Sequence, residues 1–433
     1  MRHNALVPLL AASLLTGCEL LGESPASLGG VEERLAPLAL VPGGEDDDST
    51  TDSVDDLSWV TVDAFGSGDY LHPADAVAAG ERRIRVLAGE YVLESALTIT
   101  EQDVWLEGVG ADQVVLVQAN PEADGVRLYA DGASLSGLTI DAATANAQAA
   151  VVIGDANDVL VTDNHIIGSA KQWAVYAAGP EHTVGTLDDL VLADLLSTNN
   201  EVSRNTISSP RTLDAVSFAG QSGGRVEDNV IEGTLNVFLC RDTTVVDNWL
   251  HDAPGPGLSI DLPSLDLTIE RNTIQDSAAS GIRIGPQSIH PVDTASRSGG
   301  IALLDNVVVN SGYFGVEVDG TEDLTLQGNL IAGSFYDGLY LLRSDRPLVV
   351  DNTIQDIAQC AALPPGFDWP CDSIASVYLE AEVESAAIES NVFSNLASLA
   401  SHAVLAAPEQ GNSETLIDGN TLLGDFAGGD YVL

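Results

Sequence analysis

The side chains best suited to chemistry in this 433-residue chain recur at one position of a repeated, mostly glycine-led segment. The first clear copy is Gly-Leu-Ser-Ile at 257–260, and the third position of successive copies holds Ser259, Arg283, Glu317, Tyr340 and Tyr378. Asp261 and Asp319 follow two residues later, on the same side of an extended strand. Carboxylates beside an arginine are groups that acid–base catalysis uses, and tyrosines offer flat rings for stacking.

A second repeat, built on asparagine, indicates the elements that must position these side chains. Each of ten asparagines has an aliphatic residue three positions before it and an apolar residue two positions after it; they are Asn164, Asn205, Asn229, Asn248, Asn272, Asn306, Asn329, Asn352, Asn391 and Asn420. Fixed apolar positions on both sides of a polar residue indicate a structural repeat. Five of the nine intervals between asparagines measure 19 to 24 residues, and the longer ones indicate inserted loops.

Three short strand patterns per repeat of about 22 residues predict a parallel β-helix of roughly 12 rungs over residues 58–433. Successive rungs stack at about 4.8 Å, with equivalent side chains above one another. We expect each asparagine to occupy a tight bend, where it tolerates the left-handed conformation and its amide binds backbone. A short helix from Pro73 to Ala79, ended by Gly80, is predicted to cap the N-terminal end.

The residue just before each asparagine is often charged, and one-rung stacking predicts opposite-charge pairs there. The predicted pairs are Arg204 with Asp228, Asp247 with Arg271, and Arg271 with Asp305. Exposed pairs of this kind contribute only about 0 to 1 kcal/mol each, so we interpret them mainly as control of strand register.

The asparagine repeat resembles that of the right-handed β-helix family of pectate lyases and polygalacturonases, and the related β-helix repeats of carbohydrate-binding proteins. The resemblance covers residues 58–433 and implies an all-β solenoid with three strands per rung. In that family, the strand one bend after the asparagine strand lines the substrate groove, which places the glycine-led segment there. Insertions near 178–199, 286–299 and between Cys360 and Cys371 would wall this groove, with Trp369 nearby.

Two catalytic alternatives fit such a groove. An inverting glycoside hydrolase needs two carboxyl groups roughly 6.5 to 9.5 Å apart, and Asp261, Glu317 and Asp319 could supply a pair across the rung of Arg283. A polysaccharide lyase, by the resemblance, would use Arg283 as its base and Asp261 and Asp319 as calcium ligands. The family's sharper motifs, including Gly-His-Gly and Asn-x-Asp, are missing from this chain.

The composition excludes one large class of partner. The chain has 65 acidic residues against 16 basic ones, a formal net charge of −49, and Lys171 is its only lysine. Because nucleic-acid binding depends on lysine and arginine contacts to phosphate, we predict no nucleic-acid partner. An acidic surface instead suits solubility, divalent cations or basic partners.

The N-terminal residues predict export. An apolar run from Ala5 to Leu15 follows Arg2 and is too short to span a membrane. Leu-Thr-Gly-Cys at 15–18 resembles the lipobox of bacterial lipoproteins, which implies a signal peptide over 1–17, lipidation of Cys18, and anchoring at the outer membrane or cell surface. Residues 18–57 are acidic and predict a disordered tether. In an oxidising compartment, Cys360 and Cys371 are predicted to form a disulfide.

The sequence therefore predicts a lipid-anchored surface protein whose groove contacts polysaccharide, with a binding or structural role favoured over catalysis. The candidate binding residues are Ser259, Tyr340, Tyr378 and Trp369. The alternatives are a lyase or hydrolase acting on an acidic polysaccharide, and an adhesion or scaffold protein without carbohydrate chemistry. Calcium is the one cofactor that these alternatives suggest.

Overall fold

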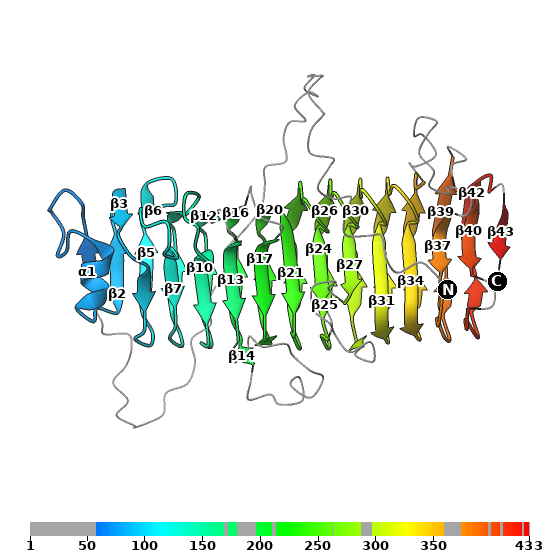
Figure 1. The fold of residues 1–433 in the computed structure, drawn as a ribbon, viewed down its shortest axis with the longest axis horizontal. Coiled ribbons are helices and arrows are strands. Elements are labelled where there is room, and N and C mark those ends of the chain that lie inside the picture. Colours follow the sequence, from blue (N-terminus) through cyan, green and yellow to red (C-terminus); the bar gives the residue numbers. More distant parts are fainter. Residues whose placement is uncertain are drawn as a thin grey trace, which may run out of the picture. The chain divides into compact units, whose positions relative to one another are not determined.

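The computed structural model describes residues 58–168, 172–179, 196–209, 214–261, 263–286, 297–358, 374–396, 400–407, 410–426 and 428–432. Three long parallel sheets run through the unit formed by residues 55–433 (Figure 1). We call these sheets A, B and C. Each rung of the chain contributes one strand to sheet A, then one to sheet B and one to sheet C, before the next rung begins. The expected three-strand parallel β-helix is therefore confirmed, and Trp369, Cys18, Cys360 and Cys371 lie outside the described residues.

Sheet A precedes the asparagine bend and holds 14 strands. Its central aliphatic side chains point inward and are fully buried along most of its length, as at Val245 and Ile269. The strands are β1 (Val60–Val62), β2 (Arg83–Val86), β5 (Trp105–Gly108), β8 (Ser134–Ser136), β11 (Leu160–Thr162), β15 (Glu201–Ser203), β19 (Arg225–Glu227), β22 (Thr244–Val246), β25 (Thr268–Glu270), β29 (Ala302–Leu304), β32 (Thr325–Gln327), β35 (Leu348–Val350), β38 (Ala387–Glu389) and β41 (Leu416–Asp418).

Sheet B follows the asparagine bend and holds 13 strands. Its inward positions carry the apolar residue of the repeat, such as Ile274 and Val308. The strands are β3 (Gly89–Leu93), β6 (Val114–Gln118), β9 (Thr139–Asp141), β12 (His165–Ile167), β16 (Thr206–Ser208), β20 (Val230–Glu232), β23 (Trp249–His251), β26 (Thr273–Gln275), β30 (Val307–Val309), β33 (Leu330–Ala332), β36 (Thr353–Gln355), β39 (Val392–Asn395) and β42 (Thr421–Gly424).

Sheet C contains the glycine-led strands and holds 14 strands, of which β28 (Ser298–Gly299) pairs beside β31. A separate two-stranded sheet joins β14 (Ser197–Thr198) and β18 (Gln221–Ser222). The main strands of sheet C are β4 (Leu97–Ile99), β7 (Val126–Leu128), β10 (Ala149–Gly154), β13 (Trp173–Ala178), β17 (Asp214–Ala219), β21 (Thr234–Phe238), β24 (Leu258–Asp261), β27 (Ile282–Gly285), β31 (Val316–Glu322), β34 (Leu339–Asp345), β37 (Ala375–Leu379), β40 (His402–Ala406) and β43 (Gly429–Val432).

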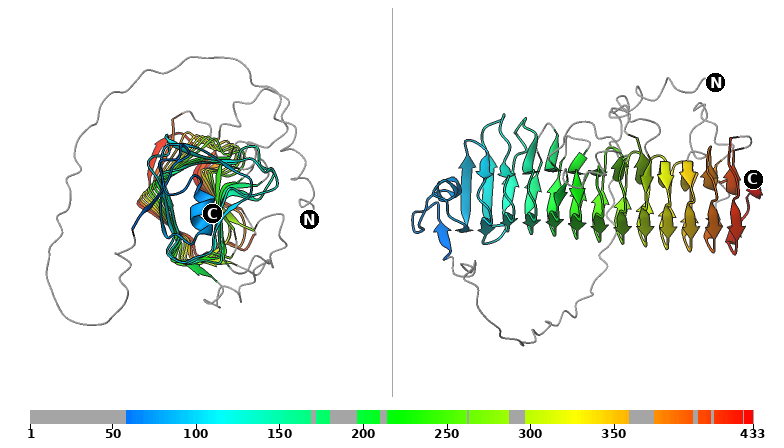
Figure 2. Two further views of the ribbon diagram at one scale, coloured as in Figure 1. Left: turned by 90° about the vertical axis from the view of Figure 1, so that its left-hand side faces the viewer. Right: turned by 90° about the horizontal axis from the view of Figure 1, so that it is seen from below.

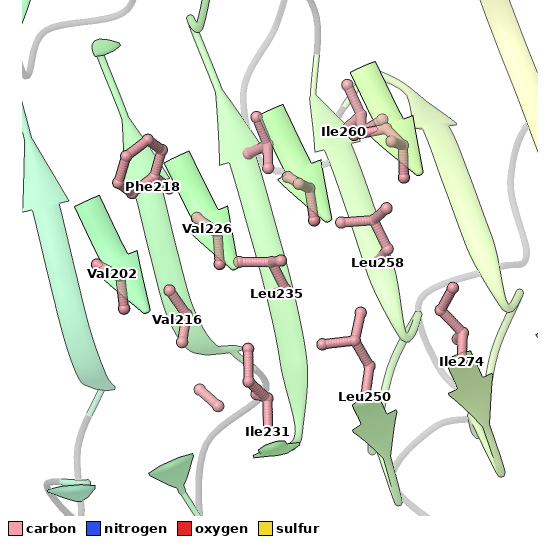
Figure 3. Packing of buried hydrophobic residues seen from close by; sticks show 14 of the residues in the cluster. Val202, Val216, Phe218, Val226, Ile231, Leu235, Leu250, Leu258, Ile260 and Ile274 are labelled. Atoms are coloured by element: carbon pink, nitrogen blue, oxygen red, sulfur yellow. The ribbon is translucent and has the colours of Figure 1, made fainter. Parts of the chain in front are cut away.

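The β-helix has 13 to 14 rungs, one or two more than the roughly 12 expected, because several rungs precede the first asparagine of the repeat. Viewed along the axis, the strands superpose into a closed outline (Figure 2). Inward side chains from all three sheets meet in one continuous apolar core (Figure 3). Because these side chains repeat in register, each rung buries its apolar face against the next rung.

The asparagine bend is held by a continuous ladder of buried amides. Asn272 is typical: its Nδ2 donates to Asn306 Oδ1 at 3.0 Å and to the Val245 carbonyl at 2.9 Å, and its backbone N–H also donates to Asn306 Oδ1. The same pattern links all ten asparagines of the repeat, from Asn164 to Asn420. The predicted amide–backbone bonding is confirmed.

The prediction that each asparagine adopts the left-handed conformation is wrong. That conformation belongs to the residue before each asparagine, for example Asp247 with φ 56° and Arg271 with φ 53°. An aspartate tolerates this conformation better than most residues. The asparagine keeps ordinary backbone angles because its amide must point along the axis toward its neighbours.

The charged side chains at these positions pair in one consistent direction. Arg271 donates to the Asp247 carboxylate from Nε and from Nη2, at 2.8 Å each, as expected. Arg204 makes the same bidentate contact with Asp163 at 3.0 Å, not the predicted one with Asp228. The predicted pair of Arg271 with Asp305 is also replaced, since that guanidinium turns back to Asp247. Each arginine therefore reaches toward the preceding rung.

Helix α1 (Pro73–Ala78) caps the N-terminal end of the solenoid and is the predicted short helix. It packs against β1, β2 and β4, and its own Ala76 is fully buried. His72 Nδ1 accepts the backbone N–H of Ala74 as an N-cap, and Pro73 occupies the first turn. No helix among the described residues is long and apolar enough to cross a membrane.

Candidate functional site

The predicted file of outward side chains on sheet C exists and is in register. Ser259 pairs with Arg283, Arg283 with Glu317, Glu317 with Tyr340, and Tyr340 with Tyr378 across β24, β27, β31, β34 and β37. A second file beside it contains Asp261, which pairs with Gly285. Gly285 lies directly beside Asp319, so two strand spacings, roughly 9.6 Å, separate the two aspartates along the axis.

Asp261 is a buried acid on this surface. Its side chain faces outward on β24 yet is only 2% exposed. Asn236 Nδ2 donates to Asp261 Oδ2 at 2.6 Å, and the Ser259 hydroxyl donates to Oδ1 at 3.3 Å. Burial raises the pKa of Asp261 to about 6, although the Asn236 hydrogen bond and the Arg283 charge oppose this shift. Asp261 therefore changes protonation state near neutral pH.

Arg283 and the two other predicted carboxylates are already engaged within the protein. The Arg283 guanidinium lies 3.8 Å from Asp261 Oδ1 and also donates to the Pro286 carbonyl. Glu317 accepts a 2.6 Å hydrogen bond from the Ser280 hydroxyl. Asp319 accepts one of 2.6 Å from Arg343 Nε, which reaches back from the next rung.

Arg283 lies 3.8 Å from Asp261, while Asp319, two strand spacings from Asp261 as the register predicts, is paired with Arg343. Strand spacing alone puts Asp261 and Asp319 roughly 9.6 Å apart along the axis, and the Asp261 side chain is buried. The predicted calcium ligands have other partners here, namely Asn236 for Asp261 and Arg343 for Asp319. Among the residues that the structure describes, no group of three or more His, Cys, Asp or Glu side chains is placed to hold a metal ion.

An aromatic platform, formed by Tyr313, Phe314, Tyr336, Tyr340 and Tyr378, lies next to this polar part of the file. Tyr340 stacks on Phe314 with ring centroids 4.6 Å apart and planes 15° apart. Tyr378 follows at 5.8 Å from Tyr340, and Tyr313 contacts Tyr336 edge-on at 4.9 Å. Burial, with a contribution from the Glu380 charge, raises the pKa of both Tyr340 and Tyr378, so their phenols stay neutral.

Sequence reasoning missed three contributors to this surface. Asn236 occupies the outward slot one rung before Ser259, but its strand is not glycine-led and so escaped the pattern. Phe314 precedes a glycine-led strand, at a bend that the strand period does not describe. Asp337 lies at the next such bend, where burial raises its pKa to about 7 and its carboxylate accepts the Ala375 N–H at 2.7 Å.

The remaining cysteine within the described residues has a structural role. Cys240 is fully buried and unpaired, and its thiol lies 3.1 Å from the Phe218 carbonyl. Burial raises the pKa of the Cys240 thiol to about 12, which makes it unreactive. The prediction of a buried apolar-like cysteine is confirmed.

Comparison with known proteins identifies the class of fold. A family model described as a right-handed β-helix region matches residues 257–433. Among solved structures, the A-module of mannuronan C-5 epimerase AlgE4 from Azotobacter vinelandii aligns at a TM-score of 0.52 and 15% identity, covering 81% of this chain and 89% of that one. The Dettilon tailspike protein aligns at a TM-score of 0.53 and 13% identity, covering 80% and 63%.

A third neighbour is DFA-IIIase from Arthrobacter chlorophenolicus, with a TM-score of 0.50, 11% identity, and coverage of 79% and 89%. No curated protein matches the sequence significantly. Identities this low support the fold and not a shared activity. The protein is a right-handed parallel β-helix protein, as the resemblance of its asparagine repeat implied.

Proposed function

We propose that the outer face of sheet C binds a linear polysaccharide along the axis of the β-helix. One observation carries the proposal: five strands, from β24 to β37, present an in-register file that changes from hydrogen-bonding groups to stacked aromatic rings. Sugar units combine hydroxyls with an apolar ring face, so a polymer can use both kinds of surface. Periodic slots about 4.8 Å apart suit a repeating ligand better than a compact one.

The charges around the file favour a neutral polymer over a uronate. Arg283 is paired with Asp261, and Arg343 is paired with Asp319. A ligand carboxylate would have to compete with one of these aspartates to bind either guanidinium. Glu317 adds a further acid within the file, and the whole chain carries a net charge of −49. A polyuronate would meet repulsion along the whole surface.

The solved neighbours agree with a polysaccharide at the coarse level. One is named for its action on mannuronan, a polysaccharide. This supports polysaccharide as the ligand class and no more, because mannuronan is itself a polyuronate; the choice of neutral polymers rests on the charge argument alone.

The test is affinity electrophoresis of the wild-type protein through gels containing single polysaccharides. Hydroxyethyl cellulose, glucomannan, xylan and dextran represent neutral polymers, and polygalacturonate and alginate represent uronates. We expect retardation by at least one neutral polymer and none by the uronates. The variant Tyr340→Ala should lose about tenfold in affinity, since removing one stacked ring costs on the order of 1 kcal/mol. A wild-type protein that no polymer retards would exclude the proposal.

A glycoside hydrolase is the second candidate function, because Asp261 combines a pKa of about 6 with a carboxylate two strand spacings away. A neutral carboxyl group is what a general acid requires. Hydrolysis would appear as new reducing ends, with activity falling as pH rises through about 6, and Asp261→Asn should abolish it. Retardation without reducing ends would leave the binding role alone.

Export and lipid anchoring remain a proposal from the lipobox-like segment at 15–18. Expression in a bacterium with radiolabelled palmitate should label the wild-type protein and not Cys18→Ala. Label retained by Cys18→Ala would contradict this assignment.

A further inference from the structure

A second pocket lies on the same outer face of sheet C, several rungs nearer the N-terminal end. It has a volume of about 370 Å³ and is lined by Tyr129, Gln148, Val152, Gly154, Asp155, Tyr176 and Ala178. Small residues form its floor, because Gly154 and Ala178 occupy the file that carries Asp261 further along. Its volume falls at the lower end of the roughly 300 to 1,000 Å³ typical of small-ligand pockets.

One wall of the pocket is a preorganised aromatic stack. Tyr176 and Trp173 lie nearly parallel, with ring centroids 4.3 Å apart and planes 10° apart. A hydrogen bond from Trp173 to the Asp214 carboxylate further fixes the indole. Burial raises the pKa of Asp214, and this hydrogen bond partly opposes that rise. Rings held in this way lose little conformational entropy when a ligand stacks on them.

The other aromatic wall is Tyr129, which is 44% exposed. Its ring rests on Gly154, where a Cβ atom would lie only 2.7 Å from Tyr129 Cε1. The absence of a side chain at position 154 therefore lets the ring lie against the backbone. Gly154 is not among the residues with positive φ, so an alanine there would displace the tyrosine without straining the strand.

The polar groups of the pocket indicate the chemical class of its ligand. Gln148 offers an amide that can both donate and accept hydrogen bonds, and Asp155 offers a carboxylate acceptor. No arginine, lysine or histidine is among the described lining residues, and the nearby Arg127 is held by Asp124 at 2.8 Å. Among the described residues of the pocket, an anionic ligand would therefore meet a carboxylate and no unpaired cation, whereas sugar hydroxyls would find both donors and acceptors.

We propose that this pocket is a second carbohydrate subsite, which holds a neutral sugar unit between Tyr129 and Tyr176. The inference rests on the proposed function, because it assigns a further part of the same polymer to the same face.

Register connects the two sites in one line. Tyr176 pairs with Ser217, Ser217 with Asn236, and Asn236 with Ser259, which begins the file described above. From Tyr176 to Tyr340 there are six strand spacings, roughly 29 Å. A linear polymer lying along sheet C therefore meets an aromatic pocket, a polar stretch and an aromatic platform in order.

The test compares short and long oligosaccharide fragments of the neutral polymers in the gel panel, with binding measured by isothermal titration calorimetry. Short fragments reach one aromatic site, and long fragments reach both. We expect Tyr129→Ala and Gly154→Ala to bind long fragments about tenfold more weakly than wild type does, because one stacking contact is lost. Their affinity for short fragments that bind the Tyr340 platform should stay unchanged.

The outcomes separate this inference from the proposed function. If Tyr129→Ala and Gly154→Ala bind long fragments as tightly as wild type while Tyr340→Ala still weakens binding, the second subsite is wrong and the first site stands. If wild type binds no fragment and no polymer, both fail. Circular dichroism melting of each variant shows whether it keeps the wild-type fold, and Gly154→Ala tests the ring's position even if Tyr129→Ala proves unstable.

Discussion

At the scale of single residues, the asparagine ladder shows how a buried polar side chain can stabilise a repeat. Each amide satisfies backbone groups in two adjacent rungs that the tight bend leaves without strand partners. Removing one amide therefore leaves several buried groups unpaired, and each such group costs about 1 to 3 kcal/mol.

The first prediction concerns Asn272, which is fully buried in the middle of the ladder. Asn272→Ala should lower the free energy of unfolding by at least about 2 kcal/mol, because Asn248, Asn306 and the Val245 carbonyl lose a partner. Urea denaturation measures the change. Asn420→Ala is the matched control: this last asparagine is half-buried, so the loss there should be smaller. Equal losses at both positions would contradict the ladder's role.

The second prediction concerns the pH dependence that buried carboxyls impose. The folded-state pKa of Asp261 is about 6, above its unfolded value of about 3.9, so the folded protein binds more protons between these pH values. Stability is highest below pH 4 for this group and falls by up to about 3 kcal/mol as pH rises to 6. Asp261→Asn should remove that fall, as measured by urea midpoints at several pH values.

Asp337→Asn provides the comparison, since its pKa of about 7 extends the same fall to higher pH. Asp261→Asn should flatten the pH profile only up to about pH 6, whereas Asp337→Asn should flatten it up to about pH 7. If Asp261→Asn leaves the pH dependence of the unfolding free energy between pH 4 and 6 unchanged, the pKa of this carboxyl is not raised.

At the scale of elements, the bend between sheets A and B places a left-handed residue in rung after rung. Where that residue is not glycine, the conformation costs on the order of 1 kcal/mol. Arg271 has φ 53° and gains an exposed ion pair with Asp247 in partial return. The bend thus accepts local strain so that the following asparagine can join the ladder.

The third prediction uses this strain. Arg271→Gly loses an exposed, solvent-screened ion pair but gains a residue suited to positive φ, so its stability should match or exceed that of wild type. Arg271→Ala loses the ion pair without that gain and should be less stable than Arg271→Gly by about 1 kcal/mol. Urea unfolding of the two variants decides the matter, and a more stable alanine variant would refute the argument.

These elements also show what the sequence could predict. The period of two within strands predicted which side chains face outward, and the asparagine spacing predicted which ones lie in line, so the file from Ser259 to Tyr378 was found in advance. The bends were not predictable in the same way, because they have no period. As a result, Phe314 and Asp337 were missed, and the left-handed conformation was given to the asparagines. The direction in which a long side chain extends was also not predictable from the sequence, since Arg204 pairs with Asp163 on the preceding rung and not with Asp228 on the next one.

At the scale of the whole molecule, the dominant feature is a net charge of −49 carried by a chain whose fold stacks rungs about 4.8 Å apart. Like charges on neighbouring rungs repel one another across distances comparable to the Debye length, which is about 10 Å at 0.1 M salt. The apolar core and the amide ladder oppose this repulsion, and both are insensitive to screening.

The fourth prediction follows from that balance. The thermal midpoint of unfolding should rise as sodium chloride increases from low to moderate concentration, because screening weakens the repulsion more than it weakens the few exposed ion pairs. Differential scanning calorimetry at a fixed pH of 7 measures it. A midpoint that falls with added salt would mean that the ion pairs, and not the repulsion, govern stability.

The central claim is that polysaccharide binding belongs to the outer face of sheet C. It is tested most directly by comparing Tyr340→Ala on sheet C with Trp249→Ala on sheet B, where Trp249 is an aromatic residue that is 44% exposed. The measurement is the dissociation constant of each variant for the neutral polymer that retards wild type. We predict about tenfold weaker binding for Tyr340→Ala and no change for Trp249→Ala. The account would be contradicted if only Trp249→Ala bound more weakly than wild type, or if both variants bound as tightly as wild type.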